Sequence, residues 1–127
     1  MAIERVIILA LVASSLISMA CAIPGSATFY TLYLPSACYG FEDHDTMIAA
    51  ANSALFNNGA ACGRSYRVRC TGPTNNGVLN PCRNDEITVR IVDGCLGCGA
   101  DQLDLSREAF SMIADPNAGR ILIDYTP

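Results

Sequence analysis

The most informative part of this chain is residues 87–110, which read ITVRIVDGCLGCGADQLDLSREAF. Apolar and more polar residues alternate over 87–92, the period of a half-buried β-strand. That strand is expected to end on Asp93 and to lead into a glycine loop with two cysteines. Asp104 is expected directly before a helix that the Ser106 hydroxyl can cap. Two carboxylates are therefore predicted at one edge of a small domain, as a site or as ordinary loop and helix-start residues.

Residues 1–22 have the features of a secretory signal peptide. Arg5 supplies the positive charge, residues 6–17 form the apolar segment, and residues 20–22 read Ala-Cys-Ala, a small-residue cleavage pattern. The apolar segment is too short to span a bilayer, although an uncleaved anchor is the alternative. Cleavage after Ala22 would leave one secreted domain, residues 23–127, with no membrane insertion.

Six cysteines remain once Cys21 leaves with the signal peptide. An even number in an oxidising compartment predicts three disulfides, although the residues alone leave about 15 connectivities open. Cys95-x-x-Cys98 also has the spacing of half a zinc site or of a redox dithiol. Zinc would need further ligands, and the single histidine, His44, lies far away in an acidic loop. A structural disulfide is favoured, and no metal or cofactor is expected.

The charge pattern argues against nucleic acid as a partner. The net charge is −4, and no basic stripe is present. Arg64, Arg67 and Arg69 form the one cationic cluster, interpreted as a solvated strand face or as a contact for an acidic partner. His44 is interpreted as a surface-loop residue, because no serine or free thiol is evident to complete a nucleophilic site.

The remaining pattern predicts short strands and two small helices. Strands are expected at 28–33, 64–70, 87–92 and 119–125, and the Gly/Pro/Asn-rich segment 71–84 is expected to be a loop. Helices are expected from about residue 46 to Asn58-Gly59, with Asp43 or Asp45 as the cap, and over 106–114. This composition indicates a mainly β barrel rather than a parallel α/β sheet.

Several motifs in order resemble a known family. They are Thr28-Phe29-Tyr30, Ala61-Cys62-Gly63 with Tyr66-x-Val68-x-Cys70, Val89-x-Ile91-Val92-Asp93-x-Cys95, and Leu103-Asp104-Leu105-Ser106 with Ala109-Phe110. Together they are similar to the first domain of expansins, and more closely to the single-domain plant natriuretic peptide (barwin/expansin-like) proteins. The resemblance covers essentially all of residues 23–127. It implies a six-stranded double-psi β-barrel with two short helices, a fold shared with family-45 glycoside hydrolases.

The resemblance also assigns roles to residues. Asp104 matches the hydrolases' general acid, Thr28 and Tyr30 match residues that line the sugar groove, and Asp93 matches a second groove carboxylate. The hydrolases' catalytic base falls on Leu32. Because inverting hydrolysis needs both an acid and a base, no hydrolytic activity is expected, unless Asp93 lies about 6.5–9.5 Å from Asp104 and replaces the base.

Other features depart from expansins or follow from the resemblance. Gln102 replaces the histidine of the expansin His-Phe-Asp pattern, tryptophan is absent, and a second, carbohydrate-binding domain is not expected. The implied disulfide pairs are Cys38–Cys62, Cys70–Cys82 and Cys95–Cys98.

The resemblance implies a secreted, monomeric, non-catalytic protein of the plant apoplast. Its first implied function is systemic signalling in water and solute homeostasis through a plasma-membrane receptor. The alternative is binding or loosening of wall polysaccharide through the retained groove. An active endoglucanase or a chitin-related defence protein is a more distant alternative.

Overall fold

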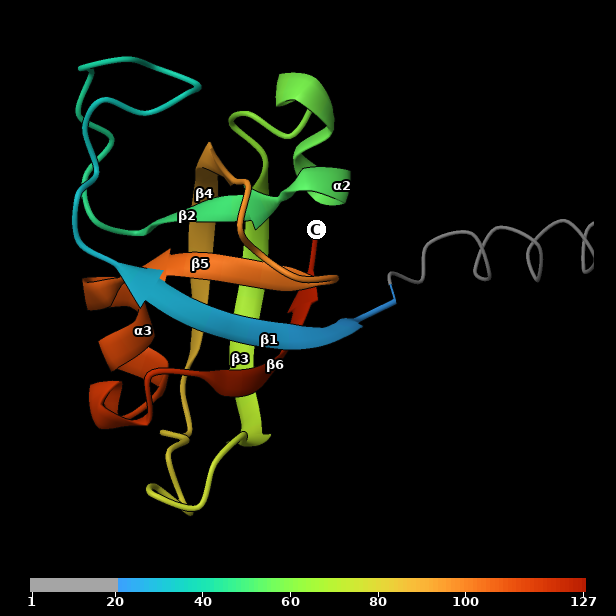
Figure 1. The fold of residues 1–127 in the computed structure, drawn as a ribbon, viewed down its shortest axis with the longest axis vertical. Helices are drawn as coiled ribbons and strands as arrows, with labels where there is room; N and C mark the ends of the chain where they lie inside the picture. Colours follow the sequence, from blue (N-terminus) through green and yellow to red (C-terminus); the bar gives the residue numbers. More distant parts are fainter. Residues whose placement is uncertain (1–20) are drawn as a thin grey trace, which may run out of the picture.

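A computed structural model describes residues 21–127 as a closed six-stranded β-barrel. The predicted signal peptide lies almost wholly outside the described residues, and β1 begins directly after the expected cleavage point. Figure 1 shows the strands wrapped around one core. Their bounds are β1 Ile23–Tyr30, β2 Ile48–Asn52, β3 Ser65–Pro73, β4 Glu86–Cys95, β5 Gln102–Ser106 and β6 Ile121–Thr126.

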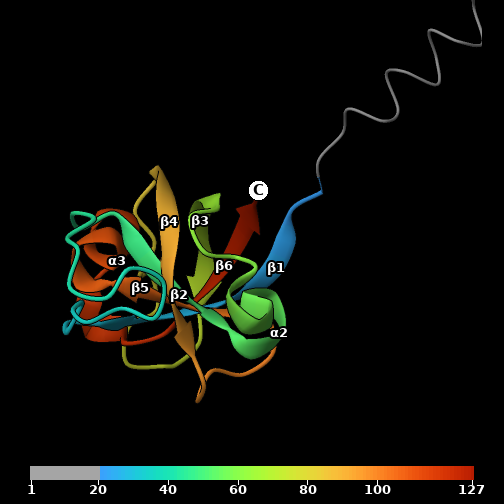
Figure 2. The same cartoon turned by 90° about the horizontal axis from the view of Figure 1, so that it is seen from above.

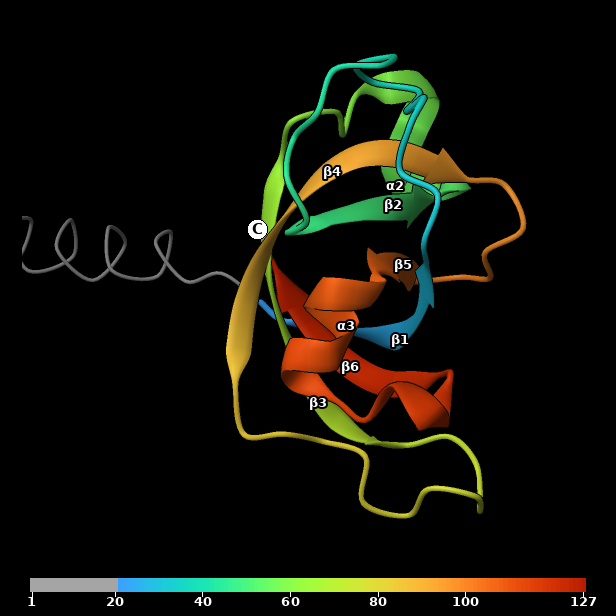
Figure 3. The same ribbon diagram turned by 90° about the vertical axis from the view of Figure 1, so that its left-hand side faces the viewer.

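The strand order around the barrel is β1-β5-β2-β4-β3-β6, and β6 closes back onto β1. Two pairs are parallel, β1 with β5 and β2 with β4, and the other four are antiparallel. Figure 3 shows β4, β2, β5 and β1 one below the other. This confirms the mainly β, double-psi barrel prediction. Closure leaves no long unpaired strand edge, which protects a small domain against pairing with other chains.

Alternating side chains of the strands fill the core. In the first part of β3 and over Glu86–Ile91 of β4, every second residue is buried, as expected for strands with one wet face. β2 differs, because all five of its residues are buried. The largest fully buried side chains are Tyr125, Phe110, Ile91, Leu103, Leu105, Ile113, Ile121 and Ile123.

Short helices lie outside the strands. α2 (Ser53–Phe56) continues into a 3-10 turn at Asn57–Gly59, and α3 (Arg107–Ile113) is followed by a second at Pro116–Ala118. Figure 2 shows α2 and α3 on opposite sides of the barrel. The predicted cap of α3 is confirmed, since the Ser106 hydroxyl accepts a hydrogen bond from the Ala109 amide at 3.0 Å. Within residues 21–127, none of these helices has the length and apolar character needed to cross a bilayer.

The helix predicted from residue 46 is wrong in its first half. Residues Ile48–Asn52 form the buried strand β2, and only Ser53–Phe56 is helical. A short, wholly buried apolar run has no wet face to reveal its period, so strand and helix look alike in sequence. The cap is Asn52, whose side chain accepts from the Leu55 amide at 3.0 Å. Asp43 instead accepts from the amide of Asp45 within the preceding loop.

Strand β5 was missed, and this changes the placement of both carboxylates. Asp104 lies in the middle of β5 rather than directly before a helix. Asp93 lies inside β4, which runs on to Cys95, and β1 ends at Tyr30 instead of Tyr33. β5 has apolar residues only at Leu103 and Leu105, and polar residues flank them, so propensity alone does not mark it as a strand.

Three disulfides brace the barrel and its loops. They join Cys38 to Cys62, Cys70 to Cys82 and Cys95 to Cys98, which are the pairs that the family resemblance implies. The first fixes the long segment after β1 to the segment before β3. The second closes the loop between β3 and β4, and the third closes the turn that follows β4.

Candidate functional site

One row of residues crosses four neighbouring strands. Thr28 of β1 is paired with Asp104 of β5, Asp104 with Ala50 of β2, and Ala50 with Asp93 of β4. Residues that pair across neighbouring strands point to the same face of a sheet. The two aspartates are thus brought together as predicted, but in the middle of the sheet and not at its edge. Two strand spacings, about 10 Å, separate their Cα atoms, with the small Ala50 side chain between them.

Asp104 is held by a neighbour on β1. The Thr28 hydroxyl donates a hydrogen bond to Asp104 Oδ1 at 2.9 Å. Burial raises the pKa of the Asp104 carboxyl above its usual range, and the bond from Thr28 opposes that rise. The carboxyl is half-buried and can therefore serve as a hydrogen-bond acceptor, or hold a proton at a higher pH than an exposed aspartate.

Asp93 anchors a loop. Its Oδ1 accepts from the amides of Ala37 at 3.1 Å and Gly94 at 2.9 Å. The neighbouring Cys38 amide donates to the Val92 carbonyl at 3.0 Å, which secures the same loop to β4. Part of the acceptor capacity of Asp93 is therefore used within the protein, on Oδ1.

Tyr30 carries a hydroxyl that no described residue satisfies. The oxygen is buried and has no hydrogen-bond partner among residues 21–127. Burial, and after it the negative charges of Asp93 and Asp104, raise the pKa of Tyr30 well above its usual range. The phenol therefore stays protonated beside both carboxylates. A buried donor without a partner is costly. A ligand hydroxyl or a water could satisfy it only if the side chains that cover it move.

Leu32 stands where the resemblance places a catalytic base. It follows the end of β1, and its side chain is 86% exposed. An aliphatic side chain can neither accept a proton nor orient a water by hydrogen bonding. The row therefore contains an acid-like carboxyl without a base at the expected position.

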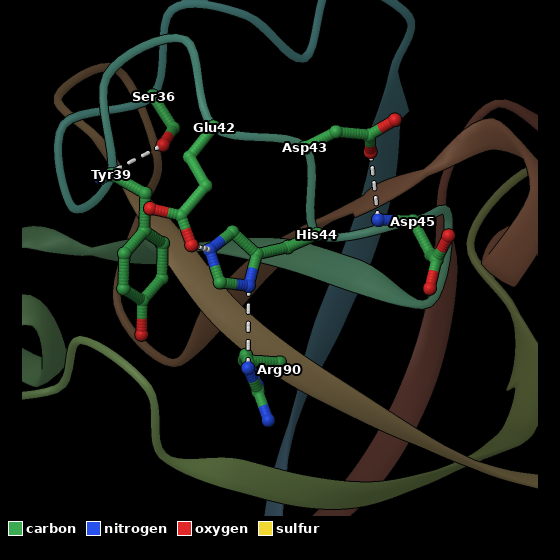
Figure 4. A network of polar contacts seen from close by, with 7 residues as sticks. All are labelled: Ser36, Tyr39, Glu42, Asp43, His44, Asp45 and Arg90. Atoms are coloured by element: carbon green, nitrogen blue, oxygen red, sulfur yellow. Dashed lines mark hydrogen bonds and ion pairs between the residues drawn. The ribbon is translucent and has the colours of Figure 1, made fainter.

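His44 lies in the loop after β1, as predicted, but its side chain is held by neighbouring residues. Its side chain is only 15% exposed, and its ring stacks on Tyr39 with centroids 3.9 Å apart. Nδ1 lies 3.2 Å from an Arg90 guanidinium nitrogen, and Nε2 lies 3.0 Å from Glu42 Oε1 in poor hydrogen-bond geometry. Figure 4 shows the ring between these two groups. The network braces the loop after β1 against β4, a role that the isolated histidine does not reveal in sequence.

Two members of the predicted arginine cluster, Arg67 and Arg69, lie away from this row, whereas the Arg64 carbonyl accepts from the Ile91 amide, two residues before Asp93. On β3, Arg67 faces Glu86 at 4.0 Å and Arg69 faces Asp124 at 3.2 Å. Arg69 pairs with the first residue of β4, whereas Asp93 lies near its other end. Surface ion pairs of this kind contribute little stability. Their carboxylates nevertheless offset part of the positive charge that an acidic partner would contact. Arg64 precedes β3 and is exposed.

Gln102 is a site residue whose role the sequence did not reveal. It is the first residue of β5 and is buried, and its Nε2 donates to Thr28 Oγ1 at 2.9 Å. The one available signal was its replacement of the histidine in the expansin pattern.

Comparison with known proteins agrees with this geometry. Residues 48–125 match a double-psi β-barrel family model described as lytic transglycolase. The chain is 52% identical over 124 residues to an EG45-like domain containing protein of Citrus jambhiri, covering 95% of this chain and 94% of that protein. It is 50% identical over 112 residues to putative EG45-like domain containing protein 1 of Arabidopsis thaliana, covering 88% and 89%.

The fold is also similar to a solved bacterial expansin. A mutant Clavibacter michiganensis expansin in complex with cellohexaose superposes with a TM-score of 0.65 at 32% sequence identity. The match covers 84% of this chain and 50% of that expansin, so this chain spans about half of its length.

Proposed function

This chain belongs to the EG45-like, expansin-like family of double-psi β-barrel proteins, and we propose that it binds wall β-glucan without hydrolysing it. The observation that carries the proposal is the row Thr28–Asp104–Ala50–Asp93 with the unsatisfied Tyr30 hydroxyl beside it. We refer to these five residues as the groove. They offer hydrogen-bond donors and acceptors of the kind that sugar hydroxyls require.

The ligand class comes from the related expansin, which was solved with cellohexaose. A β-1,4-glucan chain presents hydroxyls at regular intervals along its edges. Asp104 and the second oxygen of Asp93 can accept from such hydroxyls, and Tyr30 can donate to one. The absence of tryptophan removes the strongest stacking platform, so binding through the groove alone is expected to be weak.

The lack of a base favours binding over hydrolysis. Asp104 could protonate a leaving oxygen, but Leu32 cannot activate water on the opposite side of the sugar. Asp93 is a poor replacement, because one of its oxygens already holds the backbone of Ala37 and Gly94. A row of polar side chains without a catalytic base supports binding without hydrolysis.

Titration of the oxidised protein with cellohexaose, followed by NMR chemical shifts, tests this proposal. Tyr30→Phe removes one donor and Asp104→Asn removes a charged acceptor, so each should weaken binding by roughly two- to tenfold. Arg67→Gln, on the outer face of β3, serves as the control and should bind like the natural protein. Equal affinity in all four proteins would overturn the groove, and release of reducing ends by the natural protein would overturn the absence of catalysis.

A second proposed function is extracellular signalling in water and solute homeostasis, in the manner of the plant natriuretic peptides. Support comes from the family, from the predicted signal peptide and from a disulfide-braced fold suited to the apoplast. A plasma-membrane receptor would be the partner of a monomeric protein, and the exposed Arg64 beside Arg67 and Arg69 is the candidate contact surface.

Protoplast volume separates the two functions, because protoplasts have no wall for a glucan binder to act on. If the protein signals, the oxidised protein should swell protoplasts at micromolar concentration, and the reduced and alkylated protein should not. The triple substitution of Arg64, Arg67 and Arg69 to glutamine should then reduce the response, whereas Asp104→Asn should not. The absence of swelling with folded protein would refute the signalling role.

A further inference from the structure

A chain of hydrogen bonds leads from Arg120, directly before β6, through Gln102 and Thr28 to Asp104. Arg120 donates a guanidinium N–H to Gln102 Oε1 at 3.3 Å, and the Gly99 amide donates to the same oxygen at 2.9 Å. Gln102 Nε2 donates to Thr28 Oγ1 at 2.9 Å, and Thr28 donates to Asp104 Oδ1 at 2.9 Å. The four side chains come from β1, β5 and the segment before β6.

The chemistry of these groups fixes the direction of every bond. Two donors meet Oε1, so the amide of Gln102 must turn its NH₂ group toward Thr28. The Thr28 oxygen then accepts from Gln102, and its single hydrogen is left for Asp104. Without Gln102 the hydroxyl would be held by Asp104 alone, and its oxygen could accept from a ligand or from water instead.

Burial makes this arrangement stringent. Gln102 is 6% exposed, so bulk water reaches little of its side chain. The backbone of Arg120 is held by the loop after β3, because its carbonyl accepts from the Thr74 hydroxyl at 2.9 Å, whereas the Arg120 residue as a whole is exposed. The other end of the chain, Asp104, lies in the groove.

We propose that Gln102 is a positioning residue: it orients the Thr28 hydroxyl so that this group always donates to Asp104 Oδ1, leaving Oδ2 for the ligand. The use of this orientation in ligand binding rests on the proposed glucan groove, whereas the orientation itself does not. The bond from Thr28 favours the ionised carboxylate and opposes the rise in the Asp104 pKa that burial causes. Gln102 would therefore set which hydrogen-bond role the groove offers to a sugar hydroxyl.

The test measures ionisation of Asp104 in the ligand-free, oxidised protein, by NMR titration of its side-chain carboxyl carbon. Gln102→Met keeps the length of the side chain but removes both its donor and its acceptor. It should shift the Asp104 titration to higher pH, by up to about a tenfold change in the ionisation constant, because the Thr28 hydroxyl that donates to the charged group is no longer held in place. Thr28→Val, a nearly isosteric change, should shift it by a similar amount.

The double variant decides between positioning and a general structural effect. If Gln102 acts through Thr28, Gln102→Met should have no further effect on the titration in the Thr28→Val background. An unchanged titration in Gln102→Met, or an equal shift in both backgrounds, would overturn the proposal. Lower melting temperature alone would not support it, since any buried amide can contribute stability.

Cellohexaose binding then separates this inference from the proposed function. If the titration shifts as expected and Gln102→Met also binds cellohexaose more weakly, both stand. If the titration shifts but neither the natural protein nor the variant binds, the positioning role stands and the glucan groove fails.

Discussion

The half-buried environment of Asp104 disfavours its ionised carboxylate and so lowers the stability of the folded protein. Its carboxyl is half-buried, and burial raises its pKa more than the Thr28 hydroxyl lowers it. When the pKa of a carboxyl rises on folding, ionising that carboxyl costs more free energy in the folded protein than in the unfolded protein. That cost is absent below the ordinary aspartate pKa, grows as the pH rises to the folded-state value, and persists above it.

Asp104→Asn should therefore stabilise the protein at neutral pH. Asparagine is nearly isosteric and can still accept from Thr28, but it removes the burial of a charge. We expect a gain of less than about 1 kcal/mol at about pH 7, because solvent reaches half of the group, and no gain at about pH 3. Thermal unfolding of the oxidised protein at both pH values measures this difference. A loss of stability at neutral pH would show that the ionised carboxylate contributes favourably to the fold.

At the scale of elements, β1 is the strand on which the groove depends, and it is held by close backbone contacts. Gly25 of β1 pairs with Ile123 of β6, and it lies against the backbone of the loop before β5. A Cβ atom at Gly25 would stand 2.0 Å from the Asp101 carbonyl oxygen. β1 could accept a side chain there only by moving away from that loop.

Gly25→Ala should thus destabilise the protein by about 1–3 kcal/mol or more. Gly97→Ala is the matched control, because a Cβ atom there meets nothing within 4 Å, and its effect should stay within about 0.5 kcal/mol. Urea unfolding of the oxidised variants compares the two. A small cost at Gly25 would mean that the first residues of β1 are frayed in solution.

The elements also show where sequence reasoning succeeds. Strands β3, β4 and β6 have one wet face, so their alternation is visible in the residues, and the Ser106 cap was predicted correctly from its hydroxyl. β2 is buried on both faces and was taken for a helix. β5 was hidden because its hydrogen-bond partners, β1 and β2, are distant in sequence.

The same limit applies to the site. The motif resemblance identified Thr28, Tyr30, Asp93 and Asp104, but their alignment in one row depends on strand register, which is a property of the closed barrel. Gln102 and the His44 network escaped prediction for the same reason. Thr28 and Arg120 lie 74 and 18 residues from Gln102, and Arg90 lies 46 residues from His44.

At the scale of the whole molecule, three disulfides support a barrel that has only a modest core. They differ in the length of chain that they close: 24 residues for Cys38–Cys62, 12 for Cys70–Cys82 and 3 for Cys95–Cys98. The longest closes residues 38–62, which include His44, and it begins directly after Ala37, whose amide donates to Asp93. That bridge therefore links stability of the domain to the shape of one end of the groove.

Removing the disulfides one pair at a time should give a graded loss of stability. Chain entropy in the unfolded state predicts about 3 kcal/mol for Cys38–Cys62, slightly less for Cys70–Cys82, and about 1.5 kcal/mol for Cys95–Cys98. Paired Cys→Ser variants, unfolded in urea, measure the order. Loss of Cys38–Cys62 should also broaden the amide signals of Ala37 and Gly94, because the loop is then held to Asp93 by hydrogen bonds alone. If Cys95–Cys98 proves the most important bridge, the turn after β4 stabilises the folded barrel through native contacts, and chain entropy is not the governing term.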